Sequence, residues 1–162
     1  MQKPINRVLV YIDGSEESIM AAQFAIVMCK VMQLELYALY VVNTRALEEL
    51  VKSRIFLASE QEEYSRDIEK DADRYLNHVK HLALQKGFAI ETIKRRGTPF
   101  LEIKNEISQR QIDLLVIGEI SKIRSRRDEL FNETERAMRN VNCSVLIVKD
   151  EERVFNMYES LI

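Results

Sequence analysis

The chain has 162 residues, of which 46% are hydrophobic and 31% are charged, with a net charge of −2 and a pI near 5.8. This composition is typical of one globular domain, and the charge argues against nucleic acid or an anionic membrane as partner. No apolar run approaches the roughly 18 residues of a membrane-spanning helix. Cys29 and Cys143 are too few and too far apart for a disulfide framework, so we expect a reducing, cytoplasmic location.

Five segments are predicted to be β-strands. Four of them are short apolar runs next to turn residues, and the third in chain order alternates poorly. The first, fourth and fifth are apolar on both faces, as expected of parallel strands that helices cover on both sides. The third carries Glu91 and Lys94, which is typical of a strand at a sheet edge. In chain order the predicted strands are residues 8–12, 36–42, 88–94, 113–118 and 144–148.

Helices are predicted between these strands, because apolar residues recur there at spacings of three and four. Ser15 is placed to cap the first of them, Thr98 to cap the helix that begins at Pro99, and Gly87 to end the long one. Residues 44–58 are ambiguous, with a short helix at their start. The long helix is predicted over residues 61–86 and the last one over 132–140.

Strands that alternate with helices predict a doubly wound α/β fold. Its open, five-stranded parallel sheet has the order 3-2-1-4-5, with helices on both faces and right-handed crossovers. In such folds ligands bind at the carboxyl ends of the strands, where the strand order reverses. With the first and fourth strands as neighbours, that crevice lies between Asp13-Gly14 and Gly118. We expect one α/β domain over residues 1–150, followed by a C-terminal tail of residues 151–162.

Four sequence motifs follow one another in a fixed order. They are Asp13-Gly14-Ser15 after the first strand, Gly97-Thr98-Pro99 with Ile103 four residues on, the strand 113–118, and residues 135–148, which lead into the last strand. Each motif alone is weak, but their order and spacing together are specific. Over nearly its whole length the chain resembles the universal stress protein family.

Many members of that family bind ATP through a signature of Gly, two residues, Gly, nine residues, then Gly and Ser or Thr. Small residues are needed there because backbone amides close around the phosphates. In this chain Gly118 opens the signature, Ser121 stands in the place of the second glycine, and Phe131-Asn132 replaces the final pair. The spacing is kept, but three of the four required positions are changed, so we expect a degenerate site.

The replaced end of the signature can also be interpreted from its residues alone. Asn132, with Glu135 three positions later, predicts a capped start for the helix that follows. Glu133 and Glu135 add two negative charges to the first turn, where the helix dipole stabilises them but where they would repel a nucleotide. Phe131 puts a bulky ring where the backbone would approach a ligand.

Three other candidate nucleotide contacts have simpler alternatives. By analogy with ATP-binding relatives, Asp13 would contact the adenosine part of a nucleotide, and Val41 would offer backbone groups to the adenine. A turn held by Asp13 and core packing of Val41 are the favoured interpretations. A basic stretch could bind an anion, but a solvated loop is favoured for it. That stretch contains Lys122, Arg124, Arg126 and Arg127.

Catalytic and metal-binding patterns are weak in this sequence. His78 and His81 lie three residues apart on the long helix, where an exposed surface pair is favoured over a metal site. Because both histidines share one helix, the motifs suggest no Ser-His-Asp or Cys-His arrangement. We therefore expect a protein that is not an enzyme and that holds no metal.

Two functional classes follow from these observations. The leading hypothesis is a non-catalytic stress-response or regulatory protein that acts through contacts with another protein and needs no cofactor. The alternative is a sensor of ATP, AMP or another anionic small molecule, which would use Asp13, Gly118, Ser121 and the basic stretch. A weak nucleotide hydrolase is a third alternative, for which fold analogy alone is no support.

The last strand predicts a homodimer. Residues 144–148 are apolar on both faces yet end the sheet, and an unpaired apolar edge invites a second strand across a two-fold axis. Related stress proteins commonly dimerise in this way. The tail could instead fold back over that edge or reach across to the partner. Its candidate docking residues are Val154, Phe155, Tyr158 and Leu161.

Overall fold

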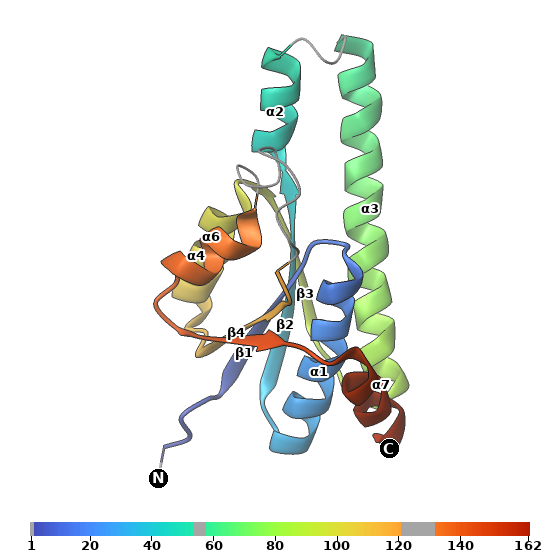
Figure 1. Ribbon diagram of the computed structural model, residues 1–162, viewed down its shortest axis with the longest axis vertical. Coiled ribbons are helices and arrows are strands. Elements are labelled where there is room, and N and C mark those ends of the chain that lie inside the picture. The colour runs from blue at the N-terminus through green and yellow to red at the C-terminus, as the bar shows by residue number, and fades with distance from the viewer. Residues whose placement is uncertain (1, 54–57, 121–131) are drawn as a thin grey trace.

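The computed structural model describes residues 2–53, 58–120 and 132–162. Within these residues five strands form one parallel sheet in the order β3-β2-β1-β4-β5, as the sequence predicted (Figure 1). The strands are β1 (Arg7–Ile12), β2 (Glu35–Asn43), β3 (Glu91–Gly97), β4 (Leu114–Gly118) and β5 (Ser144–Val148). The sheet therefore has two edges, β3 and β5, with β1 at its centre.

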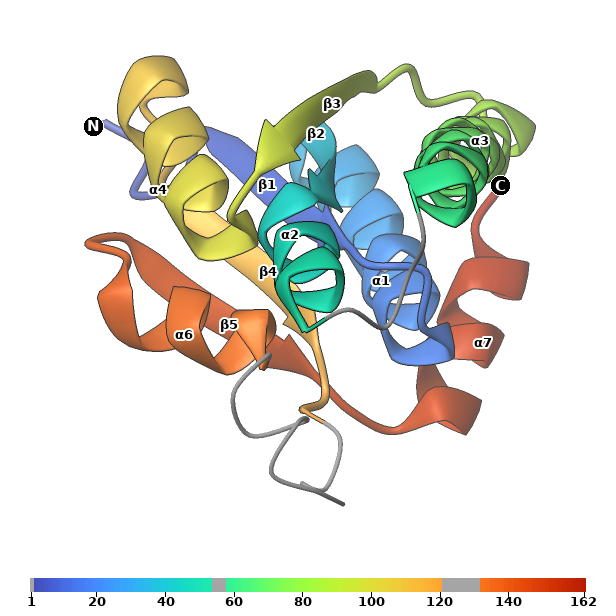
Figure 2. The same cartoon turned by 90° about the horizontal axis from the view of Figure 1, so that it is seen from above.

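Helices cover both faces of this sheet (Figure 2). One face packs against α1 (Glu16–Met32), α3 (Ala58–Gln85) and α7 (Glu151–Ser160). The other packs against α4 (Pro99–Arg110) and α6 (Glu133–Asn140). A further helix, α2 (Thr44–Lys52), follows β2 directly and extends beyond the carboxyl ends of the strands beside the first turns of α3 (Figure 1). In the described part of the chain no helix is both long and apolar enough to cross a membrane.

The core is divided in two by the central strand β1. Successive side chains of a strand point to opposite faces, so Val8, Val10 and Ile12 pack toward α1 while Leu9 and Tyr11 pack toward α4. All five side chains are buried. This burial on both faces is what the uninterrupted apolar run in the sequence predicted.

The third strand lies later in the chain than predicted. The expected strand was 88–94, but Gly87 adopts a left-handed backbone (φ 66°) and the Phe88 amide donates to the carbonyl of Ala83 at 3.0 Å. This hydrogen bond completes the end of α3, and residues 88–90 connect the helix to the strand. The strand extends instead through Arg95 and Arg96 to Gly97, because an edge strand leaves long charged side chains free to reach solvent.

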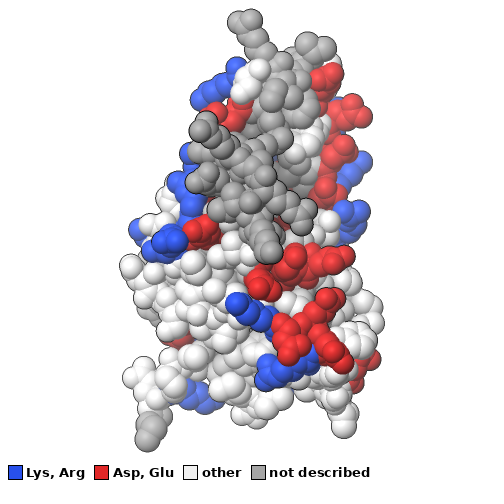
Figure 3. All heavy atoms as spheres, viewed as in Figure 1, with Lys and Arg blue, Asp and Glu red and all other residues white. Residues whose placement is uncertain are grey.

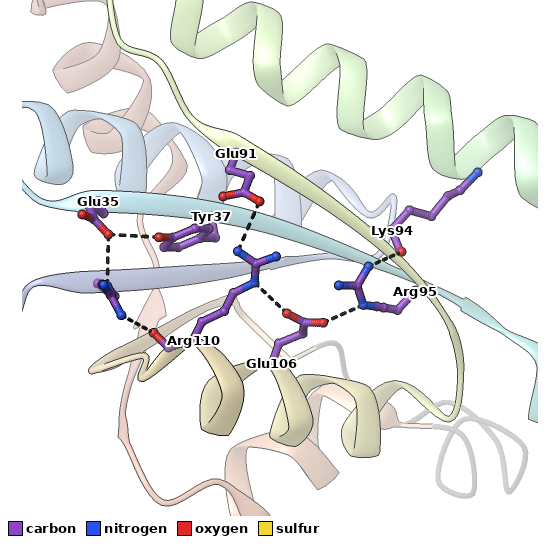
Figure 4. A network of polar contacts seen from close by, with 8 residues as sticks. Glu35, Tyr37, Glu91, Lys94, Arg95, Glu106 and Arg110 are labelled. Atoms are coloured by element: carbon purple, nitrogen blue, oxygen red, sulfur yellow. Dashed lines mark hydrogen bonds and ion pairs between the residues drawn. The ribbon is translucent and has the colours of Figure 1, made fainter.

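A network of ion pairs joins α4 to this edge (Figure 4). The buried carboxylate of Glu106 on α4 accepts hydrogen bonds from Arg95 at 2.6 Å and from Arg110 at 2.8 Å. Arg110 also pairs with Glu91 at 3.2 Å, and its guanidinium lies 5.0 Å from the ring centre of Tyr37. The hydrogen bond to Glu106 raises the pKa of Arg110. Two guanidinium groups thus compensate one buried carboxylate.

One predicted helix cap is confirmed together with its hydrogen bond, and another is confirmed in position only. The hydroxyl of Ser15 accepts a hydrogen bond from the Ser18 amide at 3.1 Å and caps α1. Thr98 stands at the corresponding position of α4, but among the described residues its side chain makes no capping hydrogen bond. The Phe100 amide at that end of α4 donates instead to the carboxylate of Glu133, 3.2 Å away on α6.

The C-terminal tail folds as α7 and packs against α1 and the end of α3. Val154 and Tyr158 are buried there, as predicted, and Leu161 is partly buried against the same core. The Tyr158 hydroxyl donates to the carbonyl of Leu82 at 2.7 Å. Phe155 is 53% exposed, so it does not dock on its own chain. The tail thus lies on a helical face and not along the edge of β5.

Candidate functional site

The strand order reverses between β1 and β4, which are paired in register from Val8↔Leu114 to Val10↔Val116. Asp13 follows the carboxyl end of β1, and Gly118 ends β4. Both therefore lie at the point where a doubly wound sheet binds its ligands. We call this place the switch point.

Asp13 holds the turn that leads from β1 into α1. Its Oδ1 accepts hydrogen bonds from the amide of Ser15 at 2.9 Å and from the hydroxyl of the same residue at 2.5 Å. The Ser18 hydroxyl donates to the Ser15 carbonyl at 2.9 Å and lies 3.3 Å from the Asp13 amide, which donates to it. The turn is therefore satisfied by its own side chains, which is the structural role that the sequence favoured for Asp13.

Two tyrosines that were not predicted as site residues lie beside this turn. Gly14 has φ 86°, and a Cβ added there would lie 2.7 Å from the ring of Tyr75 on α3. That ring stacks on Tyr40 of β2, with centroids 6.1 Å apart and an interplanar angle of 10°. Burial, together with the nearby carboxylates of Asp71 and Asp13, raises the pKa of Tyr40 to about 12. The two tyrosines thus pack beside the turn that follows β1.

Gly118 is required by packing. A Cβ at this position would lie 2.5 Å from the backbone carbonyl carbon and oxygen of Glu17. The first turn of α1 therefore rests directly on the end of β4, and only glycine leaves room for it. Packing against α1 therefore explains why the first position of the signature is glycine, whether or not a ligand is present.

Val41 lies near the end of β2 with a side chain that is only 4% exposed. It packs in the core between the sheet and α4, together with Leu39 and Ile93. Its register partner is Arg95 of the edge strand. Core packing therefore accounts for the side chain of Val41.

The start of α6 is capped as predicted. The side-chain oxygen of Asn132 accepts a hydrogen bond from the Glu135 amide at 3.0 Å. The carboxylate of Glu135 pairs with Arg139 at 3.0 Å, one turn further along the helix. One amide that a phosphate would need is thus occupied by the protein's own side chain.

Glu133 is the residue near this site whose surroundings the sequence analysis missed. It was expected only as a charge in the first turn, yet it is 5% exposed. One carboxylate oxygen accepts from the Phe100 amide at 3.2 Å, and the other pairs with Arg136 at 3.4 Å. The guanidinium of Arg136 in turn lies 4.1 Å from the ring centre of Phe100. The spacing of four between Glu133 and the buried Ala137 was the available signal, because it puts both on one face of α6.

Among the described residues, two carboxylates lie near the end of β1. Burial raises the pKa of Tyr11, at the end of β1, well above its ordinary value, and the carboxylates of Asp13 and Glu133 raise it further. Both carboxylates are therefore close enough to oppose a second negative charge near that hydroxyl. The same effect would act on the phosphates of a nucleotide.

Some predicted residues lie outside the described part of the chain. They are Ser121, Phe131 and the basic residues Lys122, Arg124, Arg126 and Arg127. His78 and His81 are exposed on α3, and Nε2 of His81 lies 3.1 Å from the side-chain nitrogen of Gln85. Over residues 2–53, 58–120 and 132–162, no three His, Cys, Asp or Glu side chains are grouped to hold a metal ion.

Sequence comparison agrees with this fold. The chain belongs to the universal stress protein family, whose model matches residues 4–149. It is 30% identical over 147 residues to the universal stress protein MJ0531 of Methanocaldococcus jannaschii, across 91% of this chain and 84% of that protein. It is 29% identical over 146 residues to YxiE of Bacillus subtilis, across 89% and 99% of the two chains. The match to the family model ends at residue 149, just before α7.

Solved structures share the fold at lower identity. The universal stress protein UspA from Lactobacillus plantarum superposes with a TM-score of 0.69 and 21% identity, covering 91% of this chain and all of that one. A family protein from Arabidopsis thaliana with AMP bound gives a TM-score of 0.64 and 16% identity, covering 91% and 94%. These likenesses establish the doubly wound fold.

Proposed function

We propose that this universal stress protein is a non-catalytic regulatory domain that acts through contacts with another protein, in the cytoplasm, and does not bind ATP. The observation that carries the proposal is the closed start of α6. In the family's ATP signature a glycine and a hydroxyl residue stand at positions 131 and 132, but here Asn132 caps the helix with its own side chain. A phosphate would have to displace that cap.

Electrostatics at the same place support the proposal. The positive end of a helix favours one nearby negative charge, and the first turn of α6 already supplies Glu133 and Glu135. Asp13 adds a third carboxylate at the end of β1. A nucleotide triphosphate would bring further negative charge into a region whose helix end is already compensated.

The hydrogen bonding of two serine hydroxyls and the protonation of the two cysteine thiols support a role without catalysis. The hydroxyls of Ser15 and Ser18 are hydrogen-bonded within the turn after β1. Burial raises the pKa of Cys29 to about 12 and raises that of Cys143, so both thiols stay protonated at neutral pH. Both cysteines are free, as is usual in a reducing compartment.

The proposal is tested on the protein as purified. Its ultraviolet absorbance spectrum and mass spectrometry of a denatured extract should reveal no bound nucleotide, and ATP or AMP at one molecule per chain would overturn it. A variant with Ser121→Gly, Phe131→Gly and Asn132→Ser restores the signature and should gain affinity for ATP. Equal affinity in the two proteins would mean that these positions do not control binding.

The second candidate function is a sensor of AMP, ATP or another anionic small molecule. It is favoured by the position of Asp13 at the switch point and by the shared fold with the Arabidopsis protein solved with AMP bound. The same extract distinguishes the two functions, because a sensor of high affinity retains its ligand through purification.

We also propose a homodimer formed through β5. In the described part of the chain this strand pairs only with β4, and Ser144 and Ile147 are exposed. The surface around β5 is mostly free of charged side chains (Figure 3). The other edge of the sheet, β3, carries Lys94 and Arg96, which discourage strand addition. Pairing of β5 with its own copy across a two-fold axis closes the assembly.

A further inference from the structure

Two helices on the same face of the sheet begin at nearly the same place. The carboxylate of Glu133, the first residue of α6, receives the Phe100 amide, the second residue of α4. The first amides of any helix lack partners within the helix and make its start an electropositive end. One carboxylate therefore lies between the positive ends of two helices.

The burial of this carboxylate requires such compensation. The side chain of Glu133 is 6% exposed, and a carboxylate this buried is unstable unless it is paired and hydrogen-bonded. Its partners are the Phe100 amide and the guanidinium of Arg136. Arg136 is itself held against the Phe100 ring at 4.1 Å. Glu133 thus supplies the hydrogen bond that Thr98, at the cap position of α4, does not supply.

We propose that the junction of the α4 and α6 N-termini is an oxyanion-binding site whose resident ligand is the carboxylate of Glu133. The site is built from one backbone amide, one guanidinium and two helix ends, which is a donor set that suits a carboxylate or a phosphate. An external oxyanion enters it only when Glu133 is removed or displaced. This inference stands whether or not the protein binds ATP.

Chemical rescue tests the site directly. Glu133→Ala removes the atoms of an acetate ion and leaves a space of that shape. We expect the midpoint of thermal unfolding to fall by several degrees and to recover by at least half as acetate replaces chloride at constant ionic strength. Acetamide, which has the shape of acetate without its charge, should give no recovery.

A matched control lies in the same helical turn. Glu135→Ala removes an equal charge whose partner, Arg139, is exposed, so acetate should restore nothing to this variant. The unaltered protein should also gain nothing, because its site is filled. A folded Glu133→Ala variant that responds to acetate no more than to chloride would overturn the proposal.

Hydrogen exchange in the unaltered protein keeps the proposal testable if Glu133→Ala does not fold. An amide in the first turn of a helix normally exchanges rapidly, since it has no acceptor in the helix. The Phe100 amide should be protected by at least about tenfold. Exchange at the unprotected rate would contradict the assignment of Glu133 as ligand.

The outcome is separable from that of the proposed function. Tight ATP binding by the unaltered protein would refute the proposed function, yet acetate rescue of Glu133→Ala would still establish the internal site. Conversely, absence of rescue would refute the internal site and leave the ATP result unaffected.

Discussion

Gly118, Asn132 and Glu133 each meet a need of the fold that involves no ligand. Gly118 admits the first turn of α1, Asn132 caps α6, and Glu133 joins the starts of α6 and α4. Two of these positions belong to the ATP signature of the family. Their chemistry in this chain is therefore explained by packing and helix capping.

Replacing Gly118 tests the packing argument. Gly118→Ala would put a Cβ into the backbone of Glu17, so α1 must shift, and overpacking of this kind costs about 1–3 kcal/mol. Chemical denaturation should show that loss in the free energy of unfolding. An unchanged midpoint would mean that the first turn of α1 moves aside freely.

Replacing Asn132 tests the cap. Asn132→Ala should lower the free energy of unfolding by about 0.5–2 kcal/mol, because the Glu135 amide loses its acceptor. Asn132→Asp is the matched control, since aspartate caps a helix as well as asparagine does. Equal destabilisation by both substitutions would show that the cap is not the cause.

Residues that act on their near neighbours in the chain could be predicted, and those that act at long range could not. The caps formed by Ser15 and Asn132 join a side chain to an amide three residues away, which the sequence displays. Thr98 does occupy the predicted cap position of α4, but the acceptor for the Phe100 amide comes from Glu133, 33 positions along the chain, and the sequence does not display that contact. The burial of Glu133 depends on that same long-range contact.

At the scale of elements, the starts of β1 and β4 are joined by one carboxylate. Asp113, just before β4, accepts hydrogen bonds from the amide of Asn6 at 2.8 Å and from that of Arg7 at 3.0 Å. These two bonds hold the pKa of Asp113 below its ordinary value. The side chain therefore stabilises the folded state only while it is ionised.

This linkage predicts how stability depends on pH. Because the pKa is lower in the folded state, the contribution of Asp113 is complete above the unfolded value of about 3.9 and is lost as the pH falls through the folded value. Asp113→Asn should therefore be less stable than the unaltered protein near neutral pH, and the difference should shrink in acid. Unfolding midpoints measured from neutral pH downward check this, and a constant difference would contradict it.

The elements themselves were predicted well where hydrophobic periodicity is clear. Four strands agree with their predicted ranges within a residue or two, and the long helix extends only a few residues beyond its predicted start. The third strand was misplaced because Phe88 and Ile90 look like strand residues, but they pack on the core from the segment that connects α3 to β3. The sequence of residues 44–58 was ambiguous, with a short helix predicted at their start. The structure confirms this helix as α2.

At the scale of the whole molecule, alternation of strands and helices was enough to predict the sheet order, since parallel strands need crossovers and the crossovers are right-handed. The position of the tail could not be predicted, because its apolar residues suit either the edge of β5 or a helical face. Burial of Val154 and Tyr158 against α1 and α3 leaves β5 available for pairing.

The proposed dimer is tested by light scattering. We expect a mass of about 38 kDa, twice the 19.0 kDa of one chain. Ile147 is 38% exposed on β5, so Ile147→Glu should spare the core and lower the mass to that of one chain. Leu146 and Val148 are poorer targets, because both pack against the core. A mass of 19 kDa for the unaltered protein at micromolar concentration would contradict the dimer.

Titration calorimetry of the unaltered protein with ATP and magnesium tests the central claim most directly. The capped start of α6 and the carboxylates of Asp13 and Glu133 predict no binding tighter than millimolar. AMP should bind no more tightly than ATP. It carries less charge and is repelled less, but the same cap on α6 remains in place. A micromolar dissociation constant for ATP would contradict the account.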